Sequence, residues 1–260
     1  MNIYKYASPV TFYPLAGKLI PWFAVLAAML AAVGLYLGLY LAPPDFQQGE
    51  VYRIIFIHVP TAWMAMIIYL VMAVYAVLAL SFNTRLSSMM MEALAPTGAM
   101  FTVLALWTGA LWGKPTWGAY WVWDARMTST LILLFLYVGY IALTHAIEDK
   151  KRADKAGALL VIVGSVNVPI IYFSVKWWNT LHQGASVSVT SGSKMASIMA
   201  LGMLVMALAC WLYAIAVALV RVRAIIIERE LEAGRAASWL DAPNAPNKVD
   251  RLNKQHQLTP

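Results

Sequence analysis

The chain has 260 residues, of which 62% are hydrophobic and only 12% are charged, and its net charge is +7. An ordinary soluble domain carries about a quarter charged residues, so this composition excludes a typical soluble enzyme and indicates an integral membrane protein. We interpret the positive charge as a signal of membrane topology and expect no nucleic-acid partner.

Six stretches of at least 20 residues contain no Asp, Glu, Lys or Arg, namely 19–44, 54–84, 93–113, 127–147, 156–175 and 195–220. A helix needs about 20 apolar residues to cross the hydrocarbon of a bilayer, and lipid offers the backbone of an isolated strand no hydrogen-bond partner. The sequence therefore predicts an all-α integral membrane domain over residues 1–232, with six transmembrane helices at about 20–42, 59–81, 93–112, 127–147, 156–175 and 195–222. Residues 233–260 are predicted to form a disordered cytoplasmic tail.

The distribution of Lys and Arg predicts how the helices are oriented. Fourteen of the 19 basic residues fall on the side that holds both chain ends, and five fall on the other side. By the positive-inside rule both termini are expected to be cytoplasmic. We therefore expect a bacterial inner-membrane protein whose segment 112–126 lies on the periplasmic face.

The sequence excludes a disulfide within the chain, covalent haem attachment and ATP binding by a P-loop. Cys210 is the single cysteine, so no disulfide forms within the chain, and no C-x-x-C-H motif for covalent haem attachment is present. The chain also lacks the G-x-x-x-x-G-K-[ST] loop that binds ATP.

Residues 112–126, WGKPTWGAYWVWDAR, hold four tryptophans together with two glycines and an aspartate. Tryptophan is common where lipid meets water, but such an aromatic belt does not require Gly118 or Asp124. If the part after Gly118 is helical, Trp117, Trp121 and Asp124 lie on one face. Asp124 is expected either to orient an indole or to cap the next helix.

Two of the four histidines, His58 and His182, are predicted on the same outer side as this segment. Each alone is most simply an interfacial residue, as we expect for His145, and His256 falls in the tail. Together, two imidazoles from two loops could hold one metal ion from opposite sides, and neutral imidazole is a good ligand for iron.

The indole-rich segment suits a large, flat, apolar ligand, because stacked aromatic pairs add about 0.5–1.5 kcal/mol beyond the burial of their area. Lys114, Arg126 and Arg53 are nearby cations that could pair with carboxylates of such a ligand. A flat ring that carries carboxylates and a metal is a haem.

Three motifs carry a resemblance to a known family. WGKPTWGAYWVWD resembles the signature of the WWD-domain haem-handling superfamily. With YRIIFIHVP before the second helix and WWNTLHQG after the fifth, the chain resembles the cytochrome c maturation protein C family (CcmC) from about residue 20 to about residue 230. The resemblance implies His58 and His182 as axial ligands of a non-covalently held haem b, iron protoporphyrin IX. It also implies a haem platform whose members are Trp112, Trp117, Trp121, Trp123 and Asp124, and we expect Gly118, which brings the backbone close, to belong to the same haem-binding site.

The same resemblance implies a function. Members of this family hold haem on the periplasmic face and promote its covalent attachment to the haem chaperone CcmE. The transporter subunits CcmA and CcmB and the small membrane protein CcmD are implied as partners. No residue suggests a dedicated acid, base or nucleophile, so an enzyme is not expected. Two alternatives stay open, a haem-exporting permease subunit and a b-type electron-transfer cytochrome.

Overall fold

The computed structural model describes residues 8–178, 187–188, 192–193 and 195–234. Its elements, in chain order, are α1 (Pro9–Tyr36), the π-helical turn η2 (Leu37–Leu41), the 3-10 helix η3 (Glu50–Ile54), α2 (Ile55–Phe82), α3 (Arg85–Trp117), α4 (Ala125–Ala146), α5 (Lys150–Gly164), α6 (Asn167–Trp177), β1 (Val187–Ser188), β2 (Gly192–Ser193) and α7 (Ser197–Glu232). The two-residue strands pair antiparallel with each other. The predicted all-α class is therefore confirmed for the described residues.

Six helical segments are long and apolar enough to cross a membrane, as the sequence predicts: Pro9–Leu41, Glu50–Phe82, Arg85–Trp117, Ala125–Ala146, Lys150–Trp177 and Ser197–Glu232. Most extend beyond the predicted ranges. A charge-free stretch measures only the apolar part of a helix, and charged residues continue the helix where it leaves the hydrocarbon.

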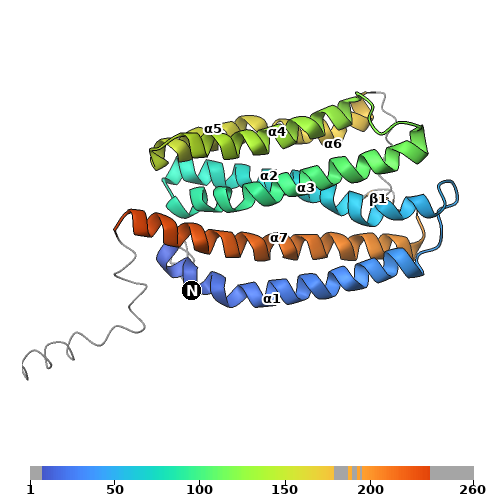
Figure 1. Cartoon of the computed structure of the whole chain (residues 1–260), viewed down its shortest axis with the longest axis horizontal. Coiled ribbons are helices and arrows are strands. Elements are labelled where there is room, and N and C mark those ends of the chain that lie inside the picture. Colours follow the sequence, from blue (N-terminus) through green and yellow to red (C-terminus); the bar gives the residue numbers. More distant parts are fainter. Residues whose placement is uncertain (1–7, 179–186, 189–191, 194, 235–260) are drawn as a thin grey trace, which may run out of the picture.

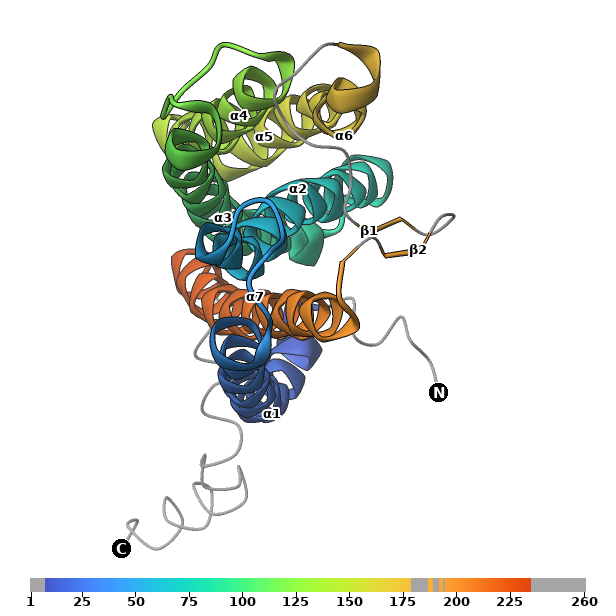
Figure 2. The same ribbon diagram turned by 90° about the vertical axis from the view of Figure 1, so that its right-hand side faces the viewer.

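The helices run side by side along the long axis of the molecule (Figure 1). Seen end-on, α1 packs on α7, α7 packs on the pair α2 and α3, and α4, α5 and α6 cover the other side of that pair (Figure 2). The start of α1 and the end of α7 lie at one end of the bundle, and the turn from α3 to α4 lies at the other (Figure 1). The placement of the chain ends in the cytoplasm stays a prediction.

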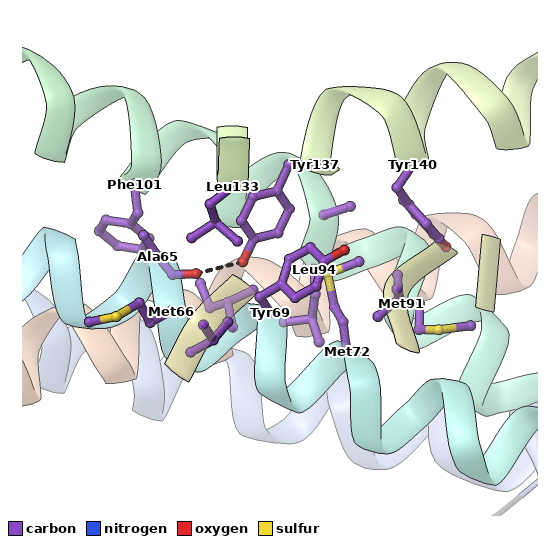
Figure 3. Close-up of a cluster of buried hydrophobic side chains, with 14 of the residues drawn as sticks. Ala65, Met66, Tyr69, Met72, Met91, Leu94, Phe101, Leu133, Tyr137 and Tyr140 are labelled. Atoms are coloured by element: carbon purple, nitrogen blue, oxygen red, sulfur yellow. Dashed lines mark hydrogen bonds between the residues drawn. The ribbon is translucent and has the colours of Figure 1, made fainter. Parts of the chain in front are cut away.

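A cluster of buried aromatic and aliphatic side chains joins α2, α3 and α4 in the middle of the bundle (Figure 3). Tyr137 on α4 is fully buried and donates its hydroxyl hydrogen to the backbone carbonyl of Ala65 on α2, with an O···O distance of 2.8 Å. Its ring meets Tyr69 edge-to-face at 5.0 Å between centroids. Cys210 of α7 is half-buried and packs against this core. These contacts fix α4 against α2, which decides where the first turn of α4 lies.

Charged side chains join three helices at the end of the bundle that holds the start of α1. Arg229 of α7 forms a bidentate pair with Asp154 of α5, at 2.8 and 2.9 Å, and also contacts Glu92 of α3. The nearly buried Glu230 pairs with Arg85. Bidentate pairs of this kind fix geometry as well as charge, so this end of α7 is held to α3 and α5.

The fifth span is interrupted between α5 and α6. Pro169 lacks the N–H that would donate to Ser165, and its ring crowds the carbonyl group four residues earlier. Asn167, at the start of α6, donates its side-chain amide to the Ser129 carbonyl at 2.8 Å. The polar residue within this span therefore has a packing partner on α4.

Two glycines give a matched test of the packing between α3 and α4. An added Cβ at Gly98 would lie 2.2 Å from Cζ of Tyr137, whereas one at Gly139 would meet only Cδ2 of Leu160, at 4.0 Å. We expect Gly98→Ala to destabilise the protein by about 1–3 kcal/mol, as overpacking does. Gly139→Ala should be neutral or stabilising, because alanine favours the helix more than glycine does. Thermal unfolding of the two variants in detergent checks this, and equal melting temperatures would contradict it.

Candidate functional site

His58 lies near the start of α2 and is held against the last turns of α3. Its Nδ1 atom is 3.0 Å from Oγ1 of Thr108, and its ring meets the indole of Trp112 edge-on, with 5.5 Å between centroids. Gly109 makes this approach possible, because a Cβ there would lie only 3.0 Å from Cε1 of the imidazole. The half-buried ring is therefore held in place by neighbouring turns of one helix.

Trp112 connects His58 to the turn between η2 and η3. Its Nε1–H donates to Oε1 of Gln48 at 2.6 Å, and its ring also contacts Tyr52 at 5.7 Å between centroids. Asp45 shapes this turn by accepting from the backbone N–H groups of Gln47 and Gln48. Trp112 thus joins His58 of α2 to Gln48 and Tyr52 through contacts inside the protein.

The tryptophan-rich segment is a helix end followed by an extended loop. α3 continues through Pro115 to Trp117 and ends at Gly118, whose φ of 81° favours glycine. Residues 119–124 are not helical. The condition for stacking Trp117, Trp121 and Asp124 at helical spacing is therefore not met.

Asp124 caps α4. Its side-chain oxygen accepts from the backbone N–H of Met127 at 2.7 Å, as an N-cap residue does. Of the two roles that the sequence left open for Asp124, capping the next helix is thus observed.

Trp121 and Trp123 lie side by side in the loop and meet edge-to-face at 5.3 Å between centroids. Trp123 is 75% exposed. Within the described part of the chain, the Nε1 atom of Trp121 is buried and has no hydrogen-bond partner. A buried donor without an acceptor is costly and is uncommon in native structures, so this N–H is a candidate donor to a ligand.

Arg126, in the first turn of α4, shares a small cavity with His58. The cavity has a volume of about 40 Å³ and lies between α2, α3, α4 and α6, with Gly109, Thr130 and several apolar side chains also in its wall. Among the described residues, the Arg126 guanidinium donates no hydrogen bond, and the Asp124 carboxylate is the charge that acts on it. A cation so placed is suited to an anionic group at the cavity mouth.

The other two cations of this region have partners in the protein. Arg53 pairs with Glu50 and donates to the Gly38 carbonyl at 2.7 Å, which joins η3 to η2. Lys114 donates to the Gly118 carbonyl at 3.1 Å and lies over the ring of Tyr120. Arg126 is thus the stronger candidate for binding an anion.

His182 lies outside the described residues, and its distance from His58 stays a prediction. Trp177 and Trp178, just before it in the chain, are about half exposed at the end of α6. His145 is exposed, and its Nδ1 contacts the Ile141 carbonyl oxygen of its own helix, as suits an interfacial residue.

The sequence reasoning missed two residues of the site, Thr108 and Gln48. Thr108 stands four residues before Trp112, which places both on one face of a helix, and this spacing was the available signal. Gln48 carried no such signal, because its contact with Trp112 depends on the folded turn.

The fold and the site together define a multi-pass membrane protein with a histidine, an arginine and a group of indoles gathered at one end of its helical bundle. The chain belongs to the CcmC family, whose model, described as heme exporter protein C, matches residues 2–237. It is 50% identical over 185 residues to heme exporter protein C of Escherichia coli (strain K12), covering 71% of this chain and 76% of that protein.

Two further relatives match nearly the whole chain. Heme exporter protein C of Bradyrhizobium diazoefficiens is 45% identical over 233 residues, 90% of this chain and 88% of the relative. The protein of the same name from Paracoccus denitrificans is 41% identical over 234 residues, 90% of this chain and 97% of the relative. With its six membrane-spanning helices, the chain is a multi-pass inner-membrane protein.

Substitutions of Asp124 test its role as a cap. Asp124→Ala should destabilise the protein by about 1 kcal/mol, because the Met127 N–H loses its acceptor. Asp124→Asn keeps a side-chain oxygen and should stay close to the parent in thermal unfolding. If Asn lowers the melting temperature as much as Ala does, the negative charge of Asp124, and not the cap, is what the protein needs.

Proposed function

We propose that this protein binds haem at the bundle end formed by the start of α2, the end of α3 and the start of α4, and presents it for covalent attachment to the haem chaperone CcmE. His58 and His182 serve as the two axial ligands of a non-covalently held haem b. The observation that carries the proposal is the meeting of His58, Trp112 and Arg126, from three different helices, beside an exposed tryptophan loop.

The side chains of this site are chemically suited to binding haem. An imidazole suits iron, a guanidinium suits a propionate carboxylate, and exposed indoles suit the porphyrin plane. The buried Trp121 N–H, which lacks an acceptor among the described residues, could donate to a second carboxylate. Membership of the CcmC family, with relatives named heme exporter protein C, agrees with this choice of ligand.

The size of the cavity argues for a haem bound at the surface of the bundle. A volume of about 40 Å³ holds a few water molecules at most, since each needs about 10–15 Å³ of such space, and it is far too small for a porphyrin. A porphyrin must therefore lie across the mouth of the cavity. Such a position leaves one edge of the ring open to a partner on the outer face.

The protein then acts mainly by positioning the haem for attachment to the chaperone. His58 and His182 hold the iron, Arg126 orients the carboxylate edge, and Trp117, Trp121 and Trp123 support the plane. Gly118 and Asp124 shape the loop that carries these indoles. Fixing two reactants in a productive geometry can remove several kcal/mol of a reaction barrier, so no acid, base or nucleophile of the chain is required.

The vinyl groups of haem supply the chemistry of attachment, and the chaperone supplies the nucleophile. We place CcmA, CcmB and CcmD around the same inner-membrane assembly as further partners. Trp123 and the exposed ends of the loop offer contact area on the outer face, where the chaperone would approach.

Single histidine substitutions test the proposal. His58→Ala and His182→Ala should each reduce the haem that purifies with the protein by about tenfold or more, since losing even a supporting residue of a metal ligand costs about 10–100-fold. Haem that remains should show an altered absorption spectrum. His145→Ala removes an exposed histidine of the opposite bundle end and should match the parent in haem content and spectrum.

Monodispersity and thermal unfolding of each variant control for misfolding. If well-folded His58→Ala and His182→Ala proteins both keep the haem content and spectrum of the parent, the two histidines are not the ligands.

A further inference from the structure

We propose that Thr108 is a positioning residue that holds the His58 imidazole in the tautomer protonated on Nδ1, so that Nε2 carries the lone pair for the iron. This inference rests on the proposed function for its purpose. The hydrogen-bond geometry that carries it exists in the protein without any ligand.

The number of available protons decides which atom donates in the hydrogen bond between Thr108 and His58. The Thr108 hydroxyl oxygen lies 2.6 Å from the Leu104 carbonyl oxygen, four residues earlier in α3, and 3.0 Å from Nδ1 of His58. Two oxygen atoms only 2.6 Å apart need a proton between them and a carbonyl oxygen has none to donate, so we assign the single hydroxyl proton of Thr108 to the hydrogen bond with Leu104. The proton of the second contact must then belong to the imidazole, which places it on Nδ1.

The rest of the pocket keeps the ring from turning over. Gly109 faces Cε1 so closely that a Cβ would lie 3.0 Å away, and the Trp112 ring stands edge-on against the imidazole at 5.5 Å between centroids. A flipped ring would bring a carbon atom to the Thr108 hydroxyl and lose the hydrogen bond. Ring orientation and tautomer are therefore fixed together.

This arrangement is one that metal-binding histidines commonly use. The nitrogen that does not bind the metal donates to an oxygen, which fixes the tautomer, orients the ring and raises the basicity of the ligating nitrogen. In most such sites the acceptor is a carboxylate, a carbonyl group or water. Here a threonine hydroxyl, itself bound to its helix backbone, takes that place.

The tautomer can be measured without haem. The full-length protein, labelled with ¹⁵N-histidine and free of haem, is studied by solid-state NMR at mildly alkaline pH. The His58 signals are assigned by their absence in His58→Ala. We expect the protonated-Nδ1 pattern in the parent and a mixture of tautomers in Thr108→Val. A protonated-Nε2 pattern for His58 in the parent overturns the proposal.

Haem binding gives the second measurement. Thr108→Val keeps the branched shape and deletes the hydroxyl, and it should weaken haemin binding by about tenfold or more and raise the reduction potential of the bound iron. Thr108→Ser keeps a hydroxyl and should restore both values. Thr102→Val is the matched control, because Thr102 is buried on the same helix and donates to the Gly98 carbonyl at 2.7 Å, with no histidine attached.

The outcomes separate this inference from the proposed function. If His58→Ala loses haem while well-folded Thr108→Val binds it like the parent, the role of Thr108 is overturned and the ligand assignment stands. If His58→Ala binds haem like the parent, the ligand assignment fails, and the NMR result still decides the tautomer. Should Thr108→Val not fold, Thr108→Ala takes its place, and a parent-like tautomer and affinity there overturn the inference.

Discussion

The close approach of α2 to α3 at Gly109 is the constraint on which the site depends. A side chain at that position would press on the imidazole of His58 and displace it by a few tenths of an ångström from its contacts with Thr108 and Trp112. The approach is set deeper in the bundle, where Tyr137 joins α4 to the backbone of α2 and packs onto Gly98 of α3. Closely packed cores tolerate little displacement, so the core determines where three helix ends meet.

Some residues of the site stabilise the fold, and others are available to bind a ligand. Trp112, Arg53 and Lys114 satisfy turns and helix ends, and their polar atoms have partners in the chain. Trp121 and Trp123 lie in a loop that begins at Gly118 and ends at Asp124, and Arg126 follows in the first turn of α4. A tryptophan-rich motif is therefore not a uniform platform, because Trp112 supports the site from inside the protein whereas Trp123 is mostly exposed.

The sequence predicted the six helices because a helix that crosses lipid satisfies its own backbone hydrogen bonds and must be apolar over about 20 residues. It did not predict their ends, because charged residues such as Arg85 and Lys150 continue a helix outside the hydrocarbon. The pairing of His58 with Thr108 was not predictable, since it depends on how two helices are aligned against each other. Motif resemblance pointed to His58, and the charge of Arg126 beside the indoles marked it as a candidate partner for a carboxylate. His182 lies in a segment that the structure leaves undescribed, so its part in the site is still a prediction from the motif.

The position of Cys210 has a consequence for a protein that handles a reactive cargo. Haem vinyl groups can bond to thiols, which is how C-x-x-C-H proteins capture haem permanently. The only thiol of this chain is half-buried against the core, thirteen residues into α7, or about 20 Å along the helix axis from the end nearest the site. A haem held as proposed would therefore lie too far from this thiol to form a bond with it.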